Sequence, residues 1–423
     1  MDVVIGGAGI SGLTMGYFLD KKKRDYILLE KQSEPGGLCR SIHQQGFIFD
    51  YTGHLLHFRY PEIESFIKSL NLKLLSHKRR AYIFFNGKLI SYPFQLNLHQ
   101  LPPEIGYHCL YDFIQRRSCP NPQNSEEFFV SEFGKSIFQY FLEPYNQKLW
   151  TIKPKYIIPD WMGRFVPHVQ LSEVLKPLFS GEEITDKGYN PFFYYPQNGI
   201  SELPLSLVKK ISQIKLNQEI IEVNWKEKKV ITEQGTYPYG KLIWTLPLKS
   251  FLNLAQPAVP EVIKKSFNNL RSVKVLDLEM GFEGKSPEYH WVYLPEENIL
   301  PYRVGCSSNF YQGKPGQFSI YAEIAFSRYK KIPPGDKKAV LEKVISSLKK
   351  YKLIDSQAKL QTYIARVIDP AYVIYDKNWK QSRKNIFVFF GKHSIVPVGR
   401  YAKWYYASME DVIFNTLKIA EMM

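Results

Sequence analysis

Three glycines near the N-terminus have the spacing of a turn that binds a dinucleotide. The stretch DVVIGGAGISGLTMGYFL runs from a short apolar strand into Gly7, Gly9 and Gly12, and then into a helix. Glycines so placed permit a tight turn, close approach of the backbone to a pyrophosphate, and tight packing of the helix on the strand. The next strand, DYILLEK, ends in Glu30, where an acid would bind ribose hydroxyls. This second strand favours a bound dinucleotide over a glycine turn without a ligand.

A second pair of glycines follows directly after this acid. The stretch EPGGLCRS, residues 34–41, contains Gly36, Gly37 and Arg40. It resembles the second glycine motif of FAD enzymes of the glutathione reductase and amine oxidase type, which enzymes that bind only NAD lack. The resemblance implies that FAD is the cofactor and that Gly36, Gly37 and Arg40 contact it.

The stretch GFIFDYTGHLLHF offers a strand followed by Gly53 and His54. In FAD enzymes of this kind the chain passes the flavin ring at this point, and a glycine favours close approach of the backbone to a ligand. A lone histidine is more often a buried core residue than a catalyst. The residues alone leave both interpretations of His54 open.

The last helix is expected to begin at the N-cap Ser408, with Glu410 and Asp411 in its first turn. Its N-terminal N–H groups and dipole can stabilise negative charge on the pyrimidine side of a reduced flavin. Arg400, just upstream, adds a full positive charge. We expect Arg400, Met409 and Asp411 to contact the cofactor, and an ordinary capped helix is the alternative.

The composition limits the classes of protein that these motifs can belong to. The chain has 423 residues, of which 44% are hydrophobic, so two or three lobes with a cleft between them are expected. No stretch approaches the ~20 consecutive apolar residues of a membrane span. Strand-like sequence follows Met1 at once, which leaves no room for a signal peptide and predicts a cytoplasmic location.

Four scattered cysteines, at positions 39, 109, 119 and 306, support neither a zinc site nor a disulfide framework, and no metal is expected. The net charge of +16 is largely dispersed lysine, and the sequence lacks RNA-binding motifs, so nucleic acid is not an expected partner.

Hydrophobic periodicity predicts the elements that must position the motifs. Residues from about 100 to 180 follow a helical pattern, residues 186–250 a helix and alternating strands, and residues 272–325 mainly strands. The C-terminal segment is expected to form a strand at NIFVFFG, a loop and the last helix. We expect an α/β fold with a Rossmann-like FAD-binding domain (residues 1–85, 186–250 and 380–423), a helical lobe (residues 95–185) and a mainly antiparallel β-sheet substrate lobe (residues 251–379 with about 80–95).

Several longer segments carry a more specific resemblance, namely PGGLCRS, DYTGHLLHF, YPFQLNLHQLP, FLEPYNQKLWTIKP, DWMGRFVP, HWVYLPEENILPYR, AYVIYD and VGRYAKWYYASMEDVI. Together they resemble the UDP-galactopyranose mutase family over most of the chain. The middle segments are more similar to the eukaryotic branch of that family, and the ending WYYASMEDVI is more similar to the bacterial branch.

The resemblance implies where a UDP-sugar binds. The YPFQ segment borders the uracil pocket in that family, so Tyr92 and Phe94 are expected to pack on the base and Gln95 to hydrogen-bond its edge. Asn146 and Trp150 of PYNQKLW are expected at the ribose and diphosphate. Without the resemblance, YPFQ is better interpreted as core aromatic residues beside a turn.

A diphosphate also requires fixed positive charge, for which a guanidinium is well suited. By resemblance, Arg303 binds the phosphates together with Tyr293, Tyr372 and Tyr406. Arg164 of DWMGRFVP is a second candidate, on a loop expected to close over the site. Its offset from Trp161 differs by one residue from the eukaryotic pattern.

The family's reaction is a redox-neutral isomerisation that requires reduced FAD. The flavin N5 attacks the anomeric carbon, UDP leaves, and the sugar recloses as a furanose before UDP returns. The resemblance therefore implies conversion of a UDP-sugar, first of all UDP-galactose, with catalytic roles for His54, Arg164, Arg303 and Arg400. NADPH or NADH is the expected reductant, and cell-surface polysaccharide biosynthesis the expected context.

The main alternative is an FAD-dependent oxidase of the protoporphyrinogen or amine oxidase type. Such an enzyme needs an apolar substrate cleft and no diphosphate clamp, so the tyrosines and arginines argue against it. A flavin-binding or nucleic-acid-binding protein without catalysis is disfavoured because the basic charge is dispersed. The sequence leaves open the sugar, the strictness for uridine and the oligomeric state, a homo-oligomer included.

Overall fold

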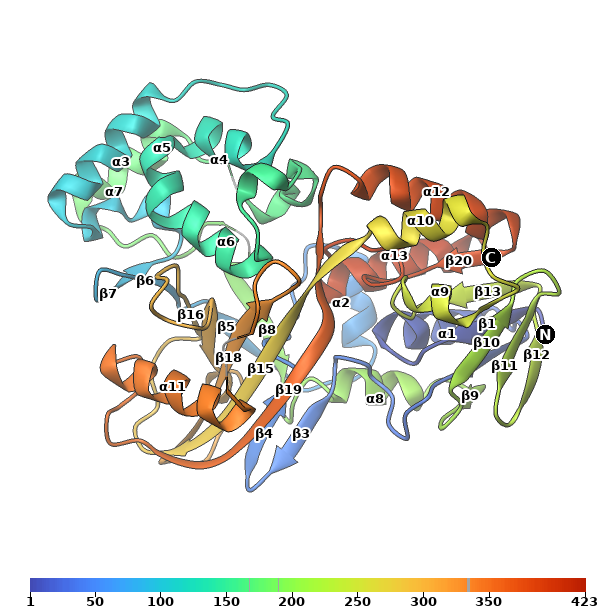
Figure 1. Ribbon diagram of the computed structural model, residues 1–423. Helices are drawn as coiled ribbons and strands as arrows, with labels where there is room; N and C mark the ends of the chain where they lie inside the picture. The colour runs from blue at the N-terminus through green and yellow to red at the C-terminus, as the bar shows by residue number, and fades with distance from the viewer. Residues whose placement is uncertain (167, 189, 333–334) are drawn as a thin grey trace.

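Figure 1 shows the computed structural model of the chain. It describes residues 1–166, 168–188, 190–332 and 335–423, with the side chain of Arg164 also outside the description. Three regions are distinct in the figure: a parallel sheet with flanking helices, a helical lobe, and a large antiparallel sheet crossed by one helix.

A five-stranded parallel sheet contains the N-terminus, and its strand order is β20-β13-β1-β2-β9. Its strands are β1 (Val3–Gly6), β2 (Tyr26–Leu29), β9 (Ile214–Lys215), β13 (Lys241–Trp244) and β20 (Ile395–Pro397). Every residue of β1 and β2 is buried, as expected for a parallel sheet covered on both faces. Helix α1 (Ile10–Lys21) packs against α8 (Glu202–Val208) and α13 (Met409–Glu421). This sheet carries the N-terminal glycine turn at the end of β1.

Smaller sheets and helices extend this region. The strands β10 (Ile220–Asn224), β11 (Lys229–Thr232), β12 (Gly235–Pro238) and β14 (Ala255–Gln256) form a four-stranded sheet. Two-stranded sheets pair β3 (Ser41–Gln44) with β4 (Phe47–Asp50), and β5 (Leu74–Lys78) with β8 (Phe192–Pro196). The remaining helices here are α2 (Pro61–Lys68), α9 (Ser250–Leu254), α10 (Glu261–Asn269) and α12 (Trp379–Lys392).

The large sheet has seven strands in the order β19-β15-β18-β17-β16-β6-β7. They are β6 (Ala81–Phe85), β7 (Lys88–Ser91), β15 (Arg271–Glu283), β16 (Trp291–Tyr293), β17 (Arg303–Cys306), β18 (Gln317–Phe326) and β19 (Lys359–Ile374). All neighbouring pairs are antiparallel except β16 with β6. Helix α11 (Lys337–Lys350) packs its apolar side on one face, and the short η7 (Ser307–Asn309) follows β17.

The helical lobe lies between β7 and β8 in the sequence. Its helices are α3 (Pro103–Gln115), α4 (Ser125–Phe133), α5 (Lys135–Ile137), α6 (Glu143–Trp150) and α7 (Leu171–Ser180), with short 3-10 turns η1 (Phe94–Leu96), η2 (Leu98–Gln100), η4 (Pro154–Tyr156), η5 (Pro159–Trp161) and η6 (Gly163–Phe165). A π-helical segment, η3 (Phe138–Leu142), connects α5 to α6 without a break. Aromatic side chains, Phe94, Phe113, Phe129 and Phe141 among them, fill the core of the lobe.

The predicted α/β fold class, with a Rossmann-like sheet, a helical lobe and a mainly antiparallel sheet, is confirmed. The residue boundaries given to the three lobes stay a prediction. The expected strand at NIFVFFG is wrong, because residues 385–391 belong to helix α12. In that helix Ser382, Ile386, Phe389 and Phe390 are buried while Val388 is exposed, which is the spacing of one helical face.

Candidate functional site

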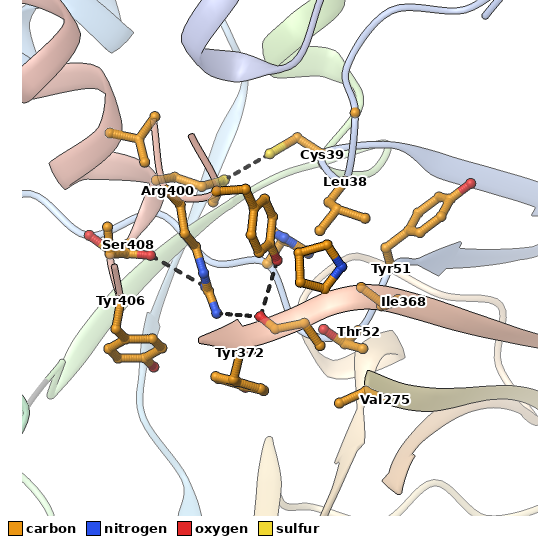
Figure 2. A pocket seen from close by; sticks show the side chains of 18 of the residues that line it. Leu38, Cys39, Tyr51, Thr52, Val275, Ile368, Tyr372, Arg400, Tyr406 and Ser408 are labelled. Atoms are coloured by element: carbon orange, nitrogen blue, oxygen red, sulfur yellow. Dashed lines mark hydrogen bonds between the residues drawn. The ribbon is translucent and has the colours of Figure 1, made fainter. Parts of the chain in front are cut away.

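A cavity of about 1040 Å³ runs from the N-terminal glycine turn to the start of the helical lobe. Its walls come from the parallel sheet, the large antiparallel sheet and α6, together with the segment before α13. Figure 2 shows its central part, where Arg400, Tyr372 and Tyr406 face Tyr51, Thr52 and Leu38 across the space.

The three glycines of the first motif have different surroundings. Gly7 has a φ of +100°, which L side chains rarely adopt, and its N–H donates to the Leu29 carbonyl at 2.8 Å. A side chain at Gly12 would collide with the Gly7 carbonyl oxygen, so this glycine lets α1 pack against the turn. A side chain at Gly9 would meet no protein atom within 4 Å, and Gly9 lines the cavity. Gly7 and Gly9 therefore border the ligand space, whereas Gly12 shapes the turn behind it.

Glu30 and the second glycine motif complete this end of the cavity. The Glu30 carboxylate accepts hydrogen bonds from the Ala8 N–H at 2.7 Å and the Gln32 N–H at 2.9 Å, and the residue lines the cavity. Gly36 donates its N–H to the Ala8 carbonyl at 2.8 Å, which joins the two glycine motifs. Gly37 also lines the cavity, where a side chain would approach the Gly9 Cα to 3.2 Å.

Arg40 connects the second motif to the loop after β4. Its Nε donates to the Gly37 carbonyl at 2.9 Å, and its Nη2 donates to the Tyr51 hydroxyl at 3.0 Å. Arg40 and Tyr51 both line the cavity. The residues predicted to hold the dinucleotide thus form one connected surface, except for Gly12, which lies behind it.

His54 lines the middle of the cavity. Burial lowers the pKa of His54 to about 4, and the nearby positive charge of Arg400 lowers it further, so the ring is neutral at pH 7. Within the described part of the chain, its Nδ1 is buried without a hydrogen-bond partner. The neutral ring therefore lines the middle of the cavity, with its Nδ1 buried beneath the surface of the wall.

The neighbouring Gly53 has a second structural reason besides the one predicted, which stays a prediction. Gly53 lines the cavity, but a side chain there would lie 2.7 Å from the Tyr321 hydroxyl. The glycine thus makes room for a tyrosine of β18 in addition to any ligand. Tyr321, which the sequence analysis missed, lines the cavity too.

Arg400 is held by backbone oxygens and tyrosine rings. Its Nη2 donates to the Ala371 carbonyl at 2.9 Å, as drawn in Figure 2, and its guanidinium lies 5.1 Å from the Tyr372 ring centre and 4.9 Å from that of Tyr406. The cation is thereby presented to the cavity beside His54.

The N-terminus of α13 is capped as predicted, but one of its residues has another role. The Ser408 hydroxyl accepts from the Asp411 N–H at 3.2 Å, and the Asp411 carboxylate accepts from the Ser408 N–H at 2.8 Å. Ser408 and Met409 line the cavity. Asp411 does not, because its carboxylate is turned back onto the helix end, so its assignment to the cofactor is corrected to a helix cap.

The YPFQ segment divides between the cavity and the core. Tyr92 and Gln95 line the cavity, and the Tyr92 ring lies 5.2 Å from that of Tyr293. Phe94 is fully buried in the helical lobe, stacked on Phe141 with ring centres 5.2 Å apart, and it does not line the cavity. The prediction that Phe94 packs on a base is therefore wrong, because the 3-10 turn η1 directs it into the aromatic core.

Asn146 and Trp150 lie on one face of α6, and both line the cavity. The Trp150 Nε1 donates to the Asn146 Oδ1 at 3.2 Å, and the Asn146 Nδ2 donates to the Leu142 carbonyl at 2.8 Å. These bonds fix the orientation of the amide and of the indole. Tyr145, absent from the predicted set, lines the cavity beside them.

Arg303 reaches the cavity but is already paired. Glu323, which is 1% exposed, accepts hydrogen bonds from both the Nε and the Nη2 of Arg303, the second at 2.8 Å. Burial alone would lower the pKa of Arg303, but the Glu323 carboxylate raises it well above the ordinary value. The strand alternation of QFSIYAEIAF places Glu323 on the same face as Tyr321, a signal that could have identified both.

Tyrosine side chains lie around this ion pair. Tyr293, Tyr372 and Tyr406 all line the cavity, and Tyr372 stacks on Tyr406 with ring centres 5.8 Å apart. The hydroxyl of Tyr302, behind them, lies 3.4 Å from that of Tyr372. The predicted Arg164 falls outside the description, since its side chain is not placed.

The Arg303–Glu323 pair begins a row of charges across the large sheet. Arg303 pairs in register with Glu323, Glu323 with Asp277, and Asp277 with Arg366, on four neighbouring strands. The Arg366 Nε donates to the Asp277 Oδ2 at 2.8 Å. Burial raises the pKa of Asp277 to about 7, although the Arg366 charge opposes the shift. Arg366 also stacks on Tyr51 at 3.8 Å, which connects the row to the loop before His54.

Among the described residues, the histidines, cysteines and acidic residues form no group of three or more that could hold a metal ion. No helix among them is long and apolar enough to cross a membrane.

The parallel sheet, the glycine turn and the cavity at that turn define a Rossmann-type dinucleotide-binding protein. Residues 5–70 match the family of NAD(P)-binding Rossmann-like domains. The whole structure is similar to that of reduced UDP-galactopyranose mutase, with a TM-score of 0.93 and 23% identity over 99% of this chain and 94% of that chain. The resemblance inferred from the sequence is therefore confirmed, and the chain has the fold of UDP-galactopyranose mutase.

The similar proteins include oxidases as well as mutases. A putative protoporphyrinogen oxidase from Exiguobacterium has a TM-score of 0.78 at 14% identity. In sequence, protoporphyrinogen oxidase 2 of Arabidopsis thaliana is 26% identical over 71% of this chain and 63% of its own length. The UDP-galactopyranose mutase of Mycoplasma pneumoniae is 24% identical over 41% of this chain and 45% of its own length. The chain thus spans less than two thirds of the length of these curated relatives.

Proposed function

We propose that this protein binds FAD and, with the flavin reduced, interconverts the pyranose and furanose forms of a UDP-sugar, UDP-galactose first of all. The observation that carries the proposal is the continuity of the cavity, in which the glycine cradle and a pocket of arginines, tyrosines and amides share one space. The full-length similarity in fold to UDP-galactopyranose mutase supports the same assignment.

The residues at the glycine end fit FAD. Gly9 offers open space where a side chain would otherwise project, as close approach of a pyrophosphate requires. Glu30 lines the same end with a fixed carboxylate, and the N-terminus of α1 follows the turn. The volume of about 1040 Å³ exceeds that of a pocket for one small ligand, so it has room for a cofactor and a substrate.

The opposite end fits the uridine diphosphate part of the substrate. Gln95 supplies an amide that can both donate to and accept from a uracil edge, and Tyr92 supplies an aromatic surface beside it. Arg303 and the hydroxyls of Tyr293, Tyr372 and Tyr406 supply donors for a diphosphate. Because Glu323 holds two guanidinium nitrogens, the remaining Nη1 of Arg303 is the nitrogen we assign to the phosphates.

The bound flavin, when reduced, would supply a nucleophilic nitrogen for the anomeric carbon of the sugar. The protein must then stabilise the charge of the departing diphosphate, a task for Arg303 and its tyrosines. His54 is neutral at pH 7, so it adds no positive charge that would draw electrons from the flavin. Arg400 and the N-terminus of α13 are placed to offset negative charge on the cofactor. Arg164 is proposed as a second phosphate ligand.

A second function, oxidation of a porphyrinogen or an amine, is favoured by the curated relative that covers most of this chain. The pocket chemistry favours the mutase, because a porphyrinogen or an apolar amine would leave the arginine and the surrounding hydroxyls without partners. Reduction by NADPH or NADH, a cytoplasmic location and assembly into a homo-oligomer are further proposals.

The redox state of the flavin tests the two functions against each other. UDP-galactose is incubated under nitrogen with oxidised protein or with dithionite-reduced protein, and the products are separated by chromatography. We expect a furanose product only from the reduced protein, with many turnovers for each reduction. Loss of the product in Arg303→Ala, but not in the exposed-site control Arg117→Ala, would connect the activity to this pocket.

Opposite results would favour the oxidase. In that case the oxidised protein is the active form, and peroxide accumulates with a porphyrinogen or an amine. Absence of a furanose product from UDP-galactose and related UDP-sugars, together with such peroxide, would overturn the proposed mutase activity. Protein that is colourless and takes up no FAD on refolding would overturn both functions.

A further inference from the structure

Lys148 lies on α6 but turns away from the cavity. Its neighbours Tyr145, Asn146, Leu149 and Trp150 all line the cavity, whereas Lys148 does not. Since residues of a helix succeed each other by about 100°, Lys148 falls on the other side of α6 from these four. The side chain is buried despite its charge, with 7% of the residue exposed. A buried lysine without a reason would be costly, so its surroundings require an explanation.

Four backbone carbonyl oxygens surround the Lys148 ammonium. They belong to Leu294, Glu296, Ile299 and Pro301, at 2.6, 2.9, 2.6 and 2.8 Å from Nζ. Burial lowers the pKa of Lys148 well below the ordinary value, and the Lys330 charge lowers it further, while the carboxylates of Glu296 and Glu297 oppose the shift. The four oxygens favour the charged form, because an ammonium donates three hydrogen bonds and an amine only two. We name these four oxygens and Nζ the carbonyl cage.

The carbonyl cage closes the loop between two strands that each end at the cavity. Strand β16 ends at Tyr293 and strand β17 begins at Arg303, and these two residues pair in register. All four oxygens of the cage come from the loop between them, residues 294–302. The loop has its own bond at its base, from the Leu294 N–H to the Tyr302 carbonyl at 2.9 Å. One ammonium therefore orders the turn that sets the positions of Tyr293 and Arg303.

The same ammonium ties this loop to the helical lobe. Helix α6 lies where the helical lobe meets the large sheet in Figure 1, and it carries Asn146 and Trp150 on its cavity side. The contacts of Lys148 Nζ with the four oxygens join the two regions, together with the ring contact of Tyr145 with Tyr293, whose centres are 5.2 Å apart, and the hydrogen bond between the Thr151 and Ser327 hydroxyls at 2.7 Å. Lys148 thus contributes a buried polar link between two walls of the pocket, one from each region.

We infer that Lys148 is a positioning residue for the substrate pocket: through the carbonyl cage it sets the distance between Arg303 and Tyr293 on the large sheet and Asn146 and Trp150 on α6. The inference rests on the proposed function, since it takes the ligand of this pocket to be a uridine diphosphate. None of the four cage oxygens belongs to the glycine cradle, so we expect FAD content to be unchanged when Lys148 is replaced.

The test removes the ammonium and restores it. In Lys148→Met, which keeps most of the volume, UDP affinity measured by calorimetry on the holoenzyme should fall at least tenfold, with FAD content unchanged. The control Lys153→Met removes an exposed positive charge from the following segment and should leave UDP affinity unchanged. In Lys148→Ala, added n-propylammonium replaces the missing atoms and should recover UDP affinity, whereas n-propanol, of similar size but neutral, should not.

A double-mutant cycle separates positioning from general destabilisation. If Lys148 acts through Arg303, Lys148→Met in an Arg303→Ala background should weaken UDP binding by much less than it does alone. Full additivity of the two losses would overturn the inference, and so would equal recovery by n-propylammonium and n-propanol. Unchanged UDP affinity in a flavin-loaded Lys148→Met protein would also overturn it.

Amide hydrogen exchange in the wild-type protein tests the carbonyl cage without UDP and without relying on variants that fold. In the wild-type holoenzyme, the Ile299 amide, bonded within the loop to the Glu296 carbonyl, should exchange as slowly as the amides of β17. Exchange of this loop at the rate of an open turn would overturn the carbonyl cage even if every variant were unstable. If the wild type binds no UDP but the loop is protected and loosens in Lys148→Met, the proposed function fails while the cage stands.

Discussion

Gly9 and Gly12 belong to one motif, yet a side chain would meet different surroundings at each. At Gly12 it would collide with the backbone of the turn, so a substitution there acts on folding. Gly9 lines the cavity, and a side chain there would project into open space. A substitution at Gly9 should therefore change ligand binding. The two positions therefore separate the stability of the turn from the binding of its cofactor.

Gly9→Val should fold but fail to bind FAD, because the branched side chain would occupy the space next to the turn where a pyrophosphate approaches the backbone. Flavin absorbance of the purified protein and its circular dichroism measure the two effects. Gly391→Val is the matched control, since a side chain there also meets no atom within 4 Å, but Gly391 lies at an exposed position near the end of α12 and away from the cavity. A yellow Gly9→Val protein would contradict the assignment of this turn to the cofactor.

Arg303→Ala should weaken UDP binding by about 2–4 kcal/mol, the range for removal of one partner of a desolvated charged contact. It should also destabilise the fold, since the buried Glu323 carboxylate loses the guanidinium that pairs with it. Adding Glu323→Gln to Arg303→Ala should recover much of the stability but none of the UDP affinity. Calorimetry and urea denaturation measure the two effects. Recovery of UDP binding in the double variant would show that the arginine was not the ligand.

At the residue scale, the sequence predicts best the residues whose role is local. The glycine turn and the Ser408 cap depend on backbone chemistry within a few residues, and both are found as expected. Phe94 was misplaced because its neighbours Tyr92 and Gln95 face the cavity while the 3-10 turn directs Phe94 inward. Glu323 was missed because its partner lies on another strand, which no short motif reveals.

At the element scale, apolar runs of strand length are the main source of error. The run IFVFF fits a buried strand as well as a helix, because periodicity alone does not separate the two over five residues. In the structure it lies in α12, where Ile386, Phe389 and Phe390 face the core and Val388 faces outward. Longer patterns, such as those of α3, α4 and β15, were predicted with the correct type.

The charge row across β17, β18, β15 and β19 makes stability depend on pH. Asp277 has a pKa of about 7 when folded and 3.8 when unfolded, because burial disfavours its charged form. Between about pH 4 and 7 the folded protein therefore keeps a proton that the unfolded chain has lost. The contribution of this group to stability is present at low pH and is lost as the pH rises through that window.

Asp277→Asn cannot ionise, so it should lose less stability than the wild type between pH 5 and pH 8, by on the order of 1 kcal/mol or more. Urea denaturation at the two pH values measures the difference. Asp2→Asn, at an exposed carboxyl, is the control and should follow the wild-type slope. Equal slopes for all three proteins would show that Asp277 is ionised throughout this range.

At the scale of the whole molecule, one cavity takes its walls from the parallel sheet, the large sheet and the helical lobe. A ligand that touches all three walls is expected to stabilise them together. UDP at about 100 times its Kd should therefore raise the free energy of unfolding of the holoenzyme by about 2.7 kcal/mol. Flavin fluorescence reports the nucleotide-binding region, and hydrogen exchange of the α6 amides reports the helical lobe. Midpoints that shift for one probe alone would contradict a shared site.

The π-helical segment Phe138–Leu142 has a consequence for the rotational phase of α6. It lies within one continuous helix, between α5 and the four residues of α6 that line the cavity. A π segment holds one residue more than an α-helix would over the same turn, and each residue of an α-helix rotates the chain by about 100°. The π segment therefore absorbs one residue without rotating the helix that follows it. Deleting one residue within Phe138–Leu142 should leave Asn146 and Trp150 facing the pocket, whereas deleting one residue from the regular α-helical turn between Leu142 and Asn146 should rotate them by about 100° away from it.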